Sequence, residues 1–394
     1  MNVLFINNIP FNPSLGGIER VTDILTKSLI KKGYNIFYLC GLVESREMLN
    51  YDFPVPMHTL PEKGLFLSTQ NKEFFYNYIT KNKIDILINQ RGLEPLFSPA
   101  LEYNFIKKIS VLHSKPSASL KQKIFFPANN YKSIVKNIII FSLYPIIYLY
   151  KRYKASKKLS NHFNYISNKS DAIVLLSELY KNEFLYYYNT KRINIPIYGI
   201  PNPNTYPTQK NNLNNKENII LYVGRLEETD KNPMVLLKIW EKLHEKHLDW
   251  KLIYVGEGSQ KTKLQTYTIK KRIKNVYFEG RKKDPTNYYK QASFICLTSN
   301  FEGWPMVLTE GMTFGCIPFA FNSFQAVKDI IDDNINGCII NAFDSKEYIS
   351  RLEKLIIDKD ERKRMSKASQ IKAQQFEVSQ IIDKWETLFN ILHH

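Results

Sequence analysis

Cysteine and glycine are scarce in this sequence of 394 residues, and no apolar run reaches the length of about 20 residues that a membrane-spanning helix needs. The cysteines lie singly in apolar stretches without a CxxC pair, so we expect a reduced, cytosolic protein without a disulfide framework or a cysteine metal site. They are Cys40, Cys296, Cys316 and Cys338. The first ten residues, MNVLFINNIP, are too short and too uncharged for a signal peptide and predict a first strand.

Acidic residues are missing from one long stretch of the chain. Between Glu102 and Asp171 there is no aspartate or glutamate, but there are 13 lysines and arginines. The first 200 residues carry 26 basic and 13 acidic side chains, and this stretch supplies the whole excess; the formal net charge of the chain is +18. We therefore expect any anionic surface that the protein meets to contact this stretch.

Residues 121–159, inside this basic stretch, do not follow the pattern of the rest of the chain. Their apolar centre, residues 138–150, contains Pro145 and is shorter than the span of about 20 residues that crosses a bilayer. Tyrosines and lysines flank the centre on both sides, which favours an interfacial helix or hairpin on an anionic membrane. A buried helix pair with a solvated basic end is the alternative.

The remaining sequence alternates strand-like and helix-like runs, which is typical of parallel sheets with crossover helices. We expect strands at residues 2–7, 35–40, 84–89, 109–113, 172–176 and 195–200, and after a break at 219–223, 250–255, 276–278, 294–297, 317–321 and 338–340. The expected helices include residues 18–32, one ending at residue 248 and one ending at residue 270. Residues 201–217 are rich in proline and asparagine and read as a linker.

The prediction is therefore an α/β protein with two Rossmann-like domains that face a cleft. The N-terminal domain covers residues 1–200 and the C-terminal domain residues 201–377. An amphipathic helix over residues 378–394 follows and is expected to return to the first domain.

The most informative stretch is residues 298–318, TSNFEGWPMVLTEGMTFGCIP. It reads as a strand end, a loop with Glu302 and Gly303, a helix that begins near Pro305 and carries Glu310, and a stop at Gly315. A helix N-terminus offers free N–H groups and a positive dipole end. We therefore expect an anionic ligand here.

Several strands of the second domain end in a loop that contains glycine. Gly224 precedes Arg225, with Lys231 shortly after, and a forked guanidinium beside a compact ammonium suits a diphosphate. The next two strands end in Gly256-Glu257-Gly258 and in Phe278-Glu279-Gly280. Because the carboxyl ends of parallel strands share one rim, we expect these loops to border one ligand site.

The first domain offers a second set of loops toward the same cleft. Gly16 and Gly17 lie between the first strand and the first helix and would admit a phosphate or a sugar. They do not form GxGxxG, so a nicotinamide cofactor is not indicated. His113 ends a strand, and Asn202-Pro203 begins the linker.

Assembled in order, these motifs resemble the retaining nucleotide-sugar glycosyltransferases of family 4, of the bacterial cell-surface polysaccharide type, which have the GT-B fold. The resemblance implies that Arg225 and Lys231 bind the donor diphosphate, that Glu302 contacts the transferred sugar and that Glu310 holds the ribose. It implies catalytic roles for Glu302, His113, Arg225 and Lys231. The full implied donor site consists of Gly16, Gly17, Asn202, Gly224, Arg225, Lys231, Gly256, Glu257, Gly280, Glu302, Gly303, Trp304, Pro305, Met306, Val307 and Glu310.

The resemblance also implies transfer with retention, without a cofactor or a metal ion, and no DxD-like pair stands where a metal-dependent enzyme would need one. The expected donor is a hexose or N-acetylhexosamine on a nucleotide diphosphate, most commonly UDP. The expected acceptor is a lipid-linked saccharide at the inner face of the cell membrane, in polysaccharide or lipopolysaccharide synthesis. The chain departs from the family where Asn232 and Gly311 replace a frequent glycine and a frequent alanine; neither change removes a charge.

Two other functions are considered. A nucleotide-sugar epimerase of the same fold would bind the same donor and release a free sugar isomer. A non-enzymatic nucleic-acid-binding protein would explain the net charge. Against the second function, the basic stretch is interleaved with a long apolar run and no nucleic-acid-binding motif is present, so no nucleic-acid partner is expected.

Overall fold

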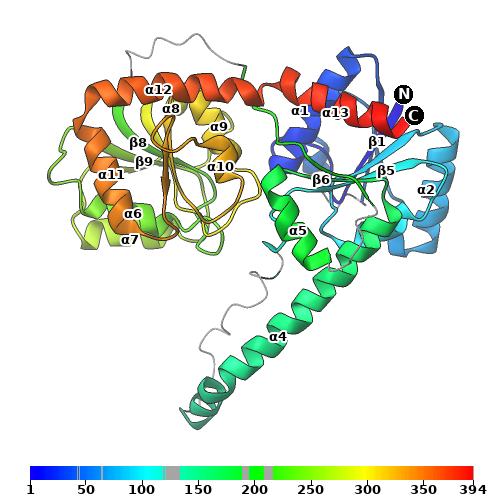
Figure 1. Cartoon of the computed structure of the whole chain (residues 1–394), viewed down its shortest axis with the longest axis horizontal. Coiled ribbons are helices and arrows are strands. Elements are labelled where there is room, and N and C mark those ends of the chain that lie inside the picture. The colour runs from blue at the N-terminus through cyan, green and yellow to red at the C-terminus, as the bar shows by residue number, and fades with distance from the viewer. Residues whose placement is uncertain are drawn as a thin grey trace.

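Two parallel sheets, each flanked by helices, make up the body of the protein (Figure 1). The structure is a computed structural model, and it describes residues 1–41, 43, 45–63, 65–118, 120, 134–188, 195–207 and 216–393. The predicted linker lies between the two sheets, although its residues 208–215 are outside the described residues. The GT-B arrangement of two Rossmann-like domains is confirmed.

The first sheet has seven parallel strands in the order β3-β2-β1-β4-β5-β6-β7. They are β1 (Asn2–Asn7), β2 (Asn35–Cys40), β3 (Met57–Thr59), β4 (Ile86–Asn89), β5 (Lys107–Leu112), β6 (Ala172–Leu175) and β7 (Ile197–Gly199). All of these except β3 were predicted from the sequence. That strand has three residues in a proline-rich segment, too few for a period to be recognised.

The second sheet has six parallel strands in the order β10-β9-β8-β11-β12-β13. They are β8 (Glu217–Val223), β9 (Lys251–Val255), β10 (Val276–Phe278), β11 (Ala292–Leu297), β12 (Ile317–Phe321) and β13 (Cys338–Ile340). All six were predicted to within two residues at each end. β11 and β12 are buried along their whole length, as expected for strands covered by helices on both faces.

The helices of the first domain are α1 (Gly17–Lys31), α2 (Thr69–Lys81), α4 (Ile134–Lys169) and α5 (Lys181–Tyr188), with short 3-10 turns η1 (Arg46–Leu49), η2 (Leu65–Leu67), η3 (Pro95–Leu101) and η4 (Glu178–Tyr180). Those of the second are α6 (Pro233–Glu241), α7 (Lys261–Lys270), α8 (Thr286–Gln291), α9 (Met306–Thr313), α10 (Val327–Ile330), α11 (Ser345–Ile357) and α12 (Lys359–Ala373), followed by η6 (Gln374–Phe376) and α13 (Val378–His393). The predicted helix through residue 248 was too long. The chain leaves the helix after Glu241 because turns then bring Leu243 and Trp250 into the core.

The C-terminal helix α13 lies against α1 of the first domain, as predicted (Figure 1). Its apolar face is buried through Ile381, Ile382, Trp385, Leu388, Phe389 and Leu392. The Phe389 ring packs on Tyr34 with centroids 5.6 Å apart, and Lys32 Nζ lies 2.8 Å from a Glu386 carboxylate oxygen. The helices α12 and α13 therefore join the two domains.

Helix α4 extends well beyond the first domain (Figure 1). Its 36 residues correspond to a length of about 54 Å. Leu159, Phe163 and Ile166 near its C-terminus are buried in the domain, whereas residues 149–154 are exposed on every side of the helix. Exposure of residues 149–154 fits an interfacial helix and also fits the solvated basic end of a buried helix pair, so both interpretations stay predictions, and residues 121–133 are outside the described residues. No helix within the described residues is long and apolar enough to cross a membrane.

Candidate functional site

The stretch singled out from the sequence forms a buried strand, a loop and a helix. We call residues 298–305, between β11 and α9, the α9 loop. The helix begins at Met306, with Pro305 at the N-cap, so Pro305 lies just outside the first helical turn in which it was predicted. The helix ends at Thr313, and Gly315 follows with φ +82°, a conformation that favours glycine and explains the stop.

Glu302 in the α9 loop is held by a lysine from a neighbouring loop. Lys231 Nζ lies 2.5 Å from Glu302 Oε1, and Ser299 Oγ donates to the same oxygen at 2.7 Å. The side chains of Lys231 and Glu302 are 19% and 10% exposed. Asn232, in place of the frequent glycine, has φ +46°, which asparagine tolerates better than most residues. Two of the predicted site residues are thus brought into contact.

Arg225 lies close by but is much more exposed. Its guanidinium contacts the Asp230 carboxylate at 2.5 Å, and 70% of its side chain is exposed to solvent. The Tyr222 hydroxyl donates a hydrogen bond to the Arg225 carbonyl at 2.8 Å and so fixes the backbone of Arg225. The Arg225 side chain is held only through its guanidinium. An exposed ion pair of this kind is weak, so the guanidinium can turn toward an arriving anion.

The glycine loops at the rim of the second sheet lie against one another. Gly224 donates its N–H to Val255, and Gly256 donates its N–H to Gly280. Gly256 has φ +155°, and a Cβ at this position would lie 1.8 Å from the Gly224 carbonyl oxygen. Glycine at 256 is therefore required by the packing of adjacent loops, whatever ligand they border.

Two acidic residues on this rim are bonded to neighbouring side chains. Glu257 accepts a hydrogen bond from Lys261 Nζ at 2.7 Å, and Glu279 accepts one from the Tyr288 hydroxyl at 2.7 Å. The predicted contact of Glu257 with a ligand therefore stays a prediction.

Glu310, on the buried side of α9, is 1% exposed and accepts three hydrogen bonds. Oε1 accepts from Thr205 Oγ1 at 2.6 Å and from Arg20 Nη1 at 3.2 Å, and Oε2 accepts from the Tyr289 hydroxyl at 2.9 Å. Arg20 belongs to α1 of the first domain, so this contact joins the two domains. None of these three partners was assigned a role from the sequence, although Arg20 lies only three residues after Gly17.

The loop with Gly16 and Gly17 has free space next to Gly17 but is in contact with a side chain at Gly16. A Cβ on Gly17 would meet nothing within 4 Å, whereas the Glu19 side chain folds back over Gly16. Glu19 is buried and accepts a hydrogen bond from Asn7 Nδ2 at 2.9 Å. Across the domain interface, Arg281 donates a hydrogen bond to the carbonyl of Ser14 in the same loop.

His113 follows β5 directly, one residue after the observed strand end. Its Nε2 lies within hydrogen-bond distance of Gln90 Oε1, while its Nδ1 is shielded and has no protein partner in the part of the chain that the structure describes. Burial, helped by the nearby Arg91 charge, lowers the pKa of His113 to about 3, so the ring is neutral near pH 7. A narrow pocket brings His113 together with Asn202 and Trp385.

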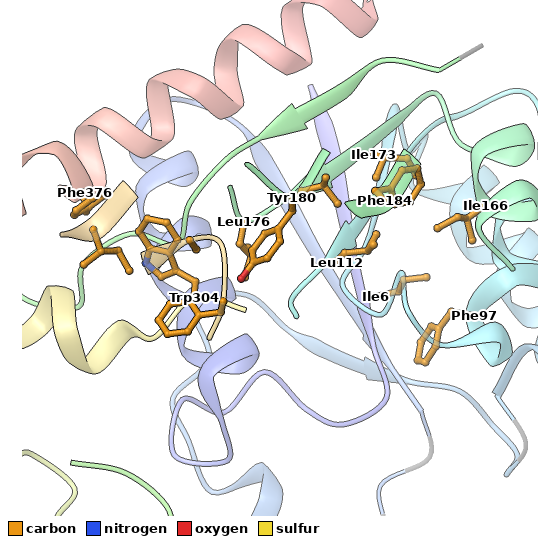
Figure 2. Close-up of a cluster of buried hydrophobic side chains, with 14 of the residues drawn as sticks. Ile6, Phe97, Leu112, Ile166, Ile173, Leu176, Tyr180, Phe184, Trp304 and Phe376 are labelled. Atoms are coloured by element: carbon orange, nitrogen blue, oxygen red, sulfur yellow. The ribbon is translucent and has the colours of Figure 1, made fainter. Parts of the chain in front are cut away.

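Gly303 brings the α9 loop against the first domain. A Cβ there would lie 2.5 Å from the His113 carbonyl oxygen, so only glycine fits. On the next residue, the Trp304 side chain is 6% exposed and packs on Phe376, with ring centroids 5.1 Å apart. Figure 2 shows this ring among apolar side chains of both domains. The ring lies in the core, and its Nε1 has no hydrogen-bond partner among the described residues.

The predicted row of N–H groups needs a correction at Pro305. Proline has no N–H, so this residue cannot donate to a ligand and only helps to begin the helix. The remaining donors are Gly303, Trp304, Met306 and Val307, at the N-terminus of α9. No cluster of three or more His, Cys, Asp or Glu side chains that could hold a metal ion occurs among the described residues.

Comparison with known proteins relates this geometry to a family. Residues 207–372 match the model of the family described as glycosyl transferases group 1. This range contains the α9 loop, Lys231, Arg225 and Glu310, so the polar cluster of the second domain lies inside the matched region.

Two bacterial relatives have related sequences. An uncharacterized glycosyltransferase of Haemophilus influenzae is 29% identical over 391 residues, which cover 97% of this chain and 98% of the relative. A GalNAc-GalNAc-diNAcBac-PP-undecaprenol α-1,4-N-acetyl-D-galactosaminyltransferase of Campylobacter jejuni is 31% identical over 172 residues, which cover 43% of this chain and 47% of the relative.

The fold also has solved counterparts. A variant of S. aureus TarM in complex with fondaparinux, α-GlcNAc-glycerol and UDP superimposes with a TM-score of 0.74 at 14% identity and covers 99% of both chains. An identity this low shows the fold alone. The chain therefore has the GT-B fold, and the family match over residues 207–372 and the full-length relative support a glycosyltransferase with a glycosyl transferases group 1 domain in its second half.

Proposed function

We propose that the chain is a retaining, metal-independent transferase of family 4. It moves a hexosyl or N-acetylhexosaminyl unit from a UDP sugar to a lipid-linked saccharide, in surface polysaccharide or lipopolysaccharide synthesis. The observation that carries the proposal is the pair of Lys231 and Glu302 at the N-terminus of α9, where an ammonium, a carboxylate and free N–H groups converge.

Negative charge builds up on the leaving diphosphate as the glycosidic bond of the donor breaks. Lys231 is mostly buried beside this position, and Arg225 is free to turn toward it. The N–H groups of Met306 and Val307 at the start of α9 add the positive end of a helix. Preorganised donors of this kind stabilise developing charge more than they stabilise the ground state. In the proposal these groups do the work that a divalent metal ion does in other transferases.

The second step concerns the ribose, which the proposal assigns to Glu310. A carboxylate offers about four lone-pair positions, and three are taken by Arg20, Thr205 and Tyr289. A ribose that donates two hydroxyl groups therefore has to displace one of these partners. Arg20 is the partner to leave, since its side chain is 36% exposed and its ion pair of 3.2 Å is the longest of the three contacts.

The third step concerns the sugar and His113. Because the His113 ring is neutral, it acts through a lone pair on Nδ1 and carries no positive charge to the site. Glu302, paired with Lys231, contacts a hydroxyl group of the transferred sugar in this proposal. Both assignments are supported by the contact of Gly303 with the His113 carbonyl, since that contact joins the two halves of the site.

The last step concerns the acceptor and the membrane. The Campylobacter relative is named for an acceptor on undecaprenol, and the similar S. aureus structure contains UDP. Exposed Leu149, Tyr150 and Tyr153 on α4 lie next to lysines and an arginine, in a stretch of sequence without acidic residues, and fit an anionic membrane surface. We propose that α4 holds the enzyme at the cytoplasmic face, where such acceptors are presented.

The test begins with a panel of nucleotide sugars and the purified full-length chain, since a bound donor raises the thermal midpoint. The stabilising donor is then incubated with extracted lipid-linked saccharides, and NMR coupling constants of the product anomeric proton report retention. We expect Arg225→Ala to lower transfer by about 30- to 1,000-fold, from about 2–4 kcal/mol of lost transition-state stabilisation.

Lys246→Ala is the matched control, because Lys246 is likewise exposed (65%) and bonded to one carboxylate, Glu353, at 3.0 Å. Equal turnover of the Arg225→Ala and Lys246→Ala variants would show that Arg225 is not part of the active site. A free sugar isomer formed from donor alone would show an epimerase instead, and an inverted product would refute the retaining mechanism.

A further inference from the structure

A tyrosine of the first domain is bonded to the backbone of the α9 loop. Tyr180 ends η4, directly after β6, and its side chain is fully buried. Its hydroxyl contacts the carbonyl oxygens of Glu302 at 2.9 Å and Gly303 at 3.0 Å. Figure 2 shows the hydroxyl directed at the loop that carries Trp304. A single hydroxyl thus contacts the carbonyl oxygens of two consecutive peptides in the other domain.

The orientation of these two peptides determines where their N–H groups point. In a planar trans peptide the C=O and the N–H point in opposite directions. The peptide of the Glu302 carbonyl carries the N–H of Gly303, and the peptide of the Gly303 carbonyl carries the N–H of Trp304. Because both carbonyls face Tyr180, both N–H groups face away from the first-domain tyrosine.

These two N–H groups also lack acceptors. Gly303 and Trp304 are buried, and within the described residues neither N–H donates to a protein atom. Buried N–H groups without an acceptor are rare in native proteins, since each one costs about as much as a lost hydrogen bond. Two of them side by side, at the start of a helix, therefore indicate oxygen atoms of a ligand.

The loop has little freedom to turn these peptides by itself. On one side, Gly303 is pressed against the His113 carbonyl, so close that a Cβ would not fit. On the other side, the Trp304 ring is fixed against Phe376. Only the direction of the peptide planes between these two contacts remains to be set, and the Tyr180 hydroxyl sets it.

We propose that Tyr180 is a positioning residue for sugar transfer: it holds the carbonyls of Glu302 and Gly303 so that the N–H groups of Gly303 and Trp304 point at the transferred sugar. The inference rests on the proposed function, which places the sugar at this loop. It adds a residue of the first domain to the geometry of the donor site.

The chain supports Tyr180 in this role. Ser177 caps η4, since its Oγ accepts the N–H of Leu179 at 3.0 Å, and this cap fixes the position of the tyrosine ring. Burial raises the pKa of the Tyr180 hydroxyl, so the group remains a donor near neutral pH.

The test compares Tyr180→Phe with Tyr348→Phe. Both tyrosines are fully buried and both hydroxyls donate to a backbone carbonyl of another element, Tyr348 to Phe319 at 3.3 Å. The Tyr348 contact lies inside the second domain and away from the α9 loop, so the control measures the cost of losing a buried hydroxyl as such. We expect the two variants to have thermal midpoints that fall by similar amounts.

Only Tyr180→Phe is expected to lower kcat with the UDP sugar, by about 10- to 100-fold, since small displacements of positioning groups have effects of this size. Its affinity for UDP, which lacks the sugar, should stay within twofold of the unmodified protein. A kcat within twofold of the Tyr348→Phe variant, or an equal loss of UDP affinity, would overturn the positioning role.

A second measurement does not depend on turnover. Hydrogen–deuterium exchange of peptides that cover residues 301–307 should be faster in Tyr180→Phe and unchanged in Tyr348→Phe. Should Tyr180→Phe fail to fold, Ser177→Ala loosens η4 with the hydroxyl retained and should change exchange in the same direction, less strongly. An unmodified chain that transfers no sugar would refute the proposed function alone, whereas unchanged exchange in the tyrosine variant would refute this inference.

Discussion

Replacement of Lys231 by methionine tests the central ion pair most directly. Methionine keeps an aliphatic stem of similar length and removes only the charge. Lys231 Nζ lies 2.5 Å from a Glu302 carboxylate oxygen, and the two side chains are 19% and 10% exposed. The substitution therefore leaves Glu302 mostly buried, with Ser299 as its remaining hydrogen-bond donor.

The expected loss of stability follows from that burial. Removing one partner of a fully buried pair costs about 3–5 kcal/mol, because a charge is left without compensation. Here a fifth of the Lys231 side chain reaches solvent, so we expect about 2 kcal/mol, still more than the upper limit of about 1 kcal/mol for an exposed pair. The double variant Lys231→Met/Glu302→Gln carries no uncompensated charge and should regain most of this loss.

Catalysis should respond differently from stability. Under the proposed function the Lys231 ammonium faces the leaving diphosphate. It is absent from both variants, so transfer should fall by about 30- to 1,000-fold in each. Denaturant unfolding can be followed by tryptophan fluorescence, since Trp240, Trp250 and Trp304 all lie in the second domain, and transfer by release of nucleotide. A double variant that regains transfer together with stability would show that Lys231 only neutralises Glu302, and would refute the diphosphate assignment.

Three further predictions concern other parts of the chain. Gly256→Ala should unfold the second domain or lower its stability by more than about 3 kcal/mol, because the new Cβ meets the Gly224 carbonyl at 1.8 Å; a soluble variant with an unchanged denaturation midpoint would contradict this packing. The folded pKa of His113, about 3, is below its ordinary 6.5, so its contribution to stability is complete above pH 6.5 and lost as pH falls toward 3. Between pH 7 and 5 the unmodified chain should lose about 2 kcal/mol more than His113→Gln in denaturant titrations, and parallel losses would refute the buried neutral ring. Lys151→Glu/Lys154→Glu should weaken sedimentation with anionic vesicles but not with neutral ones, and addition of salt should weaken the binding of the unmodified chain; equal sedimentation of the two proteins would exclude this part of α4 from the contact.

The sequence was sufficient for most of the fold because buried parallel strands are short, apolar and separated by helices. All strands of the second sheet were found in this way, and β3 was missed because it has only three residues. The end of α6 was also misplaced, since Leu243 and Trp250 continue an apolar pattern that the chain buries in turns. A periodic pattern indicates which residues are buried, but it does not indicate whether a helix or a series of turns buries them.

From the sequence, only those site residues could be brought together that lie near strand ends within one domain. Lys231 and Glu302 meet because adjacent strands bring their loops to one rim. The partners of Glu310 were missed, since Arg20 lies 290 residues away in the other domain. Tyr180 has no local motif at all, and its contact depends on how the two domains are placed. The lowered pKa of His113 likewise depends on burial, which a strand-end position does not reveal.

Two of the contacts across the domain interface, those of Arg20 and Tyr180, have different relations to the donor. Arg20 occupies a lone pair of Glu310 that the ribose needs under the proposed function, so donor binding and this contact compete. Weakening the Arg20 contact should then strengthen donor binding, by at most the factor by which the contact is weakened. Tyr180, in contrast, is bonded to carbonyl oxygens whose peptides present their N–H groups on the opposite side, so the tyrosine and a sugar bind the same peptides without competition. Because a hydrogen bond at a C=O polarises the N–H of the same peptide, the Tyr180 contact strengthens those N–H groups as donors. Under the proposed function, the nucleotide therefore displaces the first-domain contact at Glu310, whereas the sugar binds without displacing the first-domain contact at Gly303.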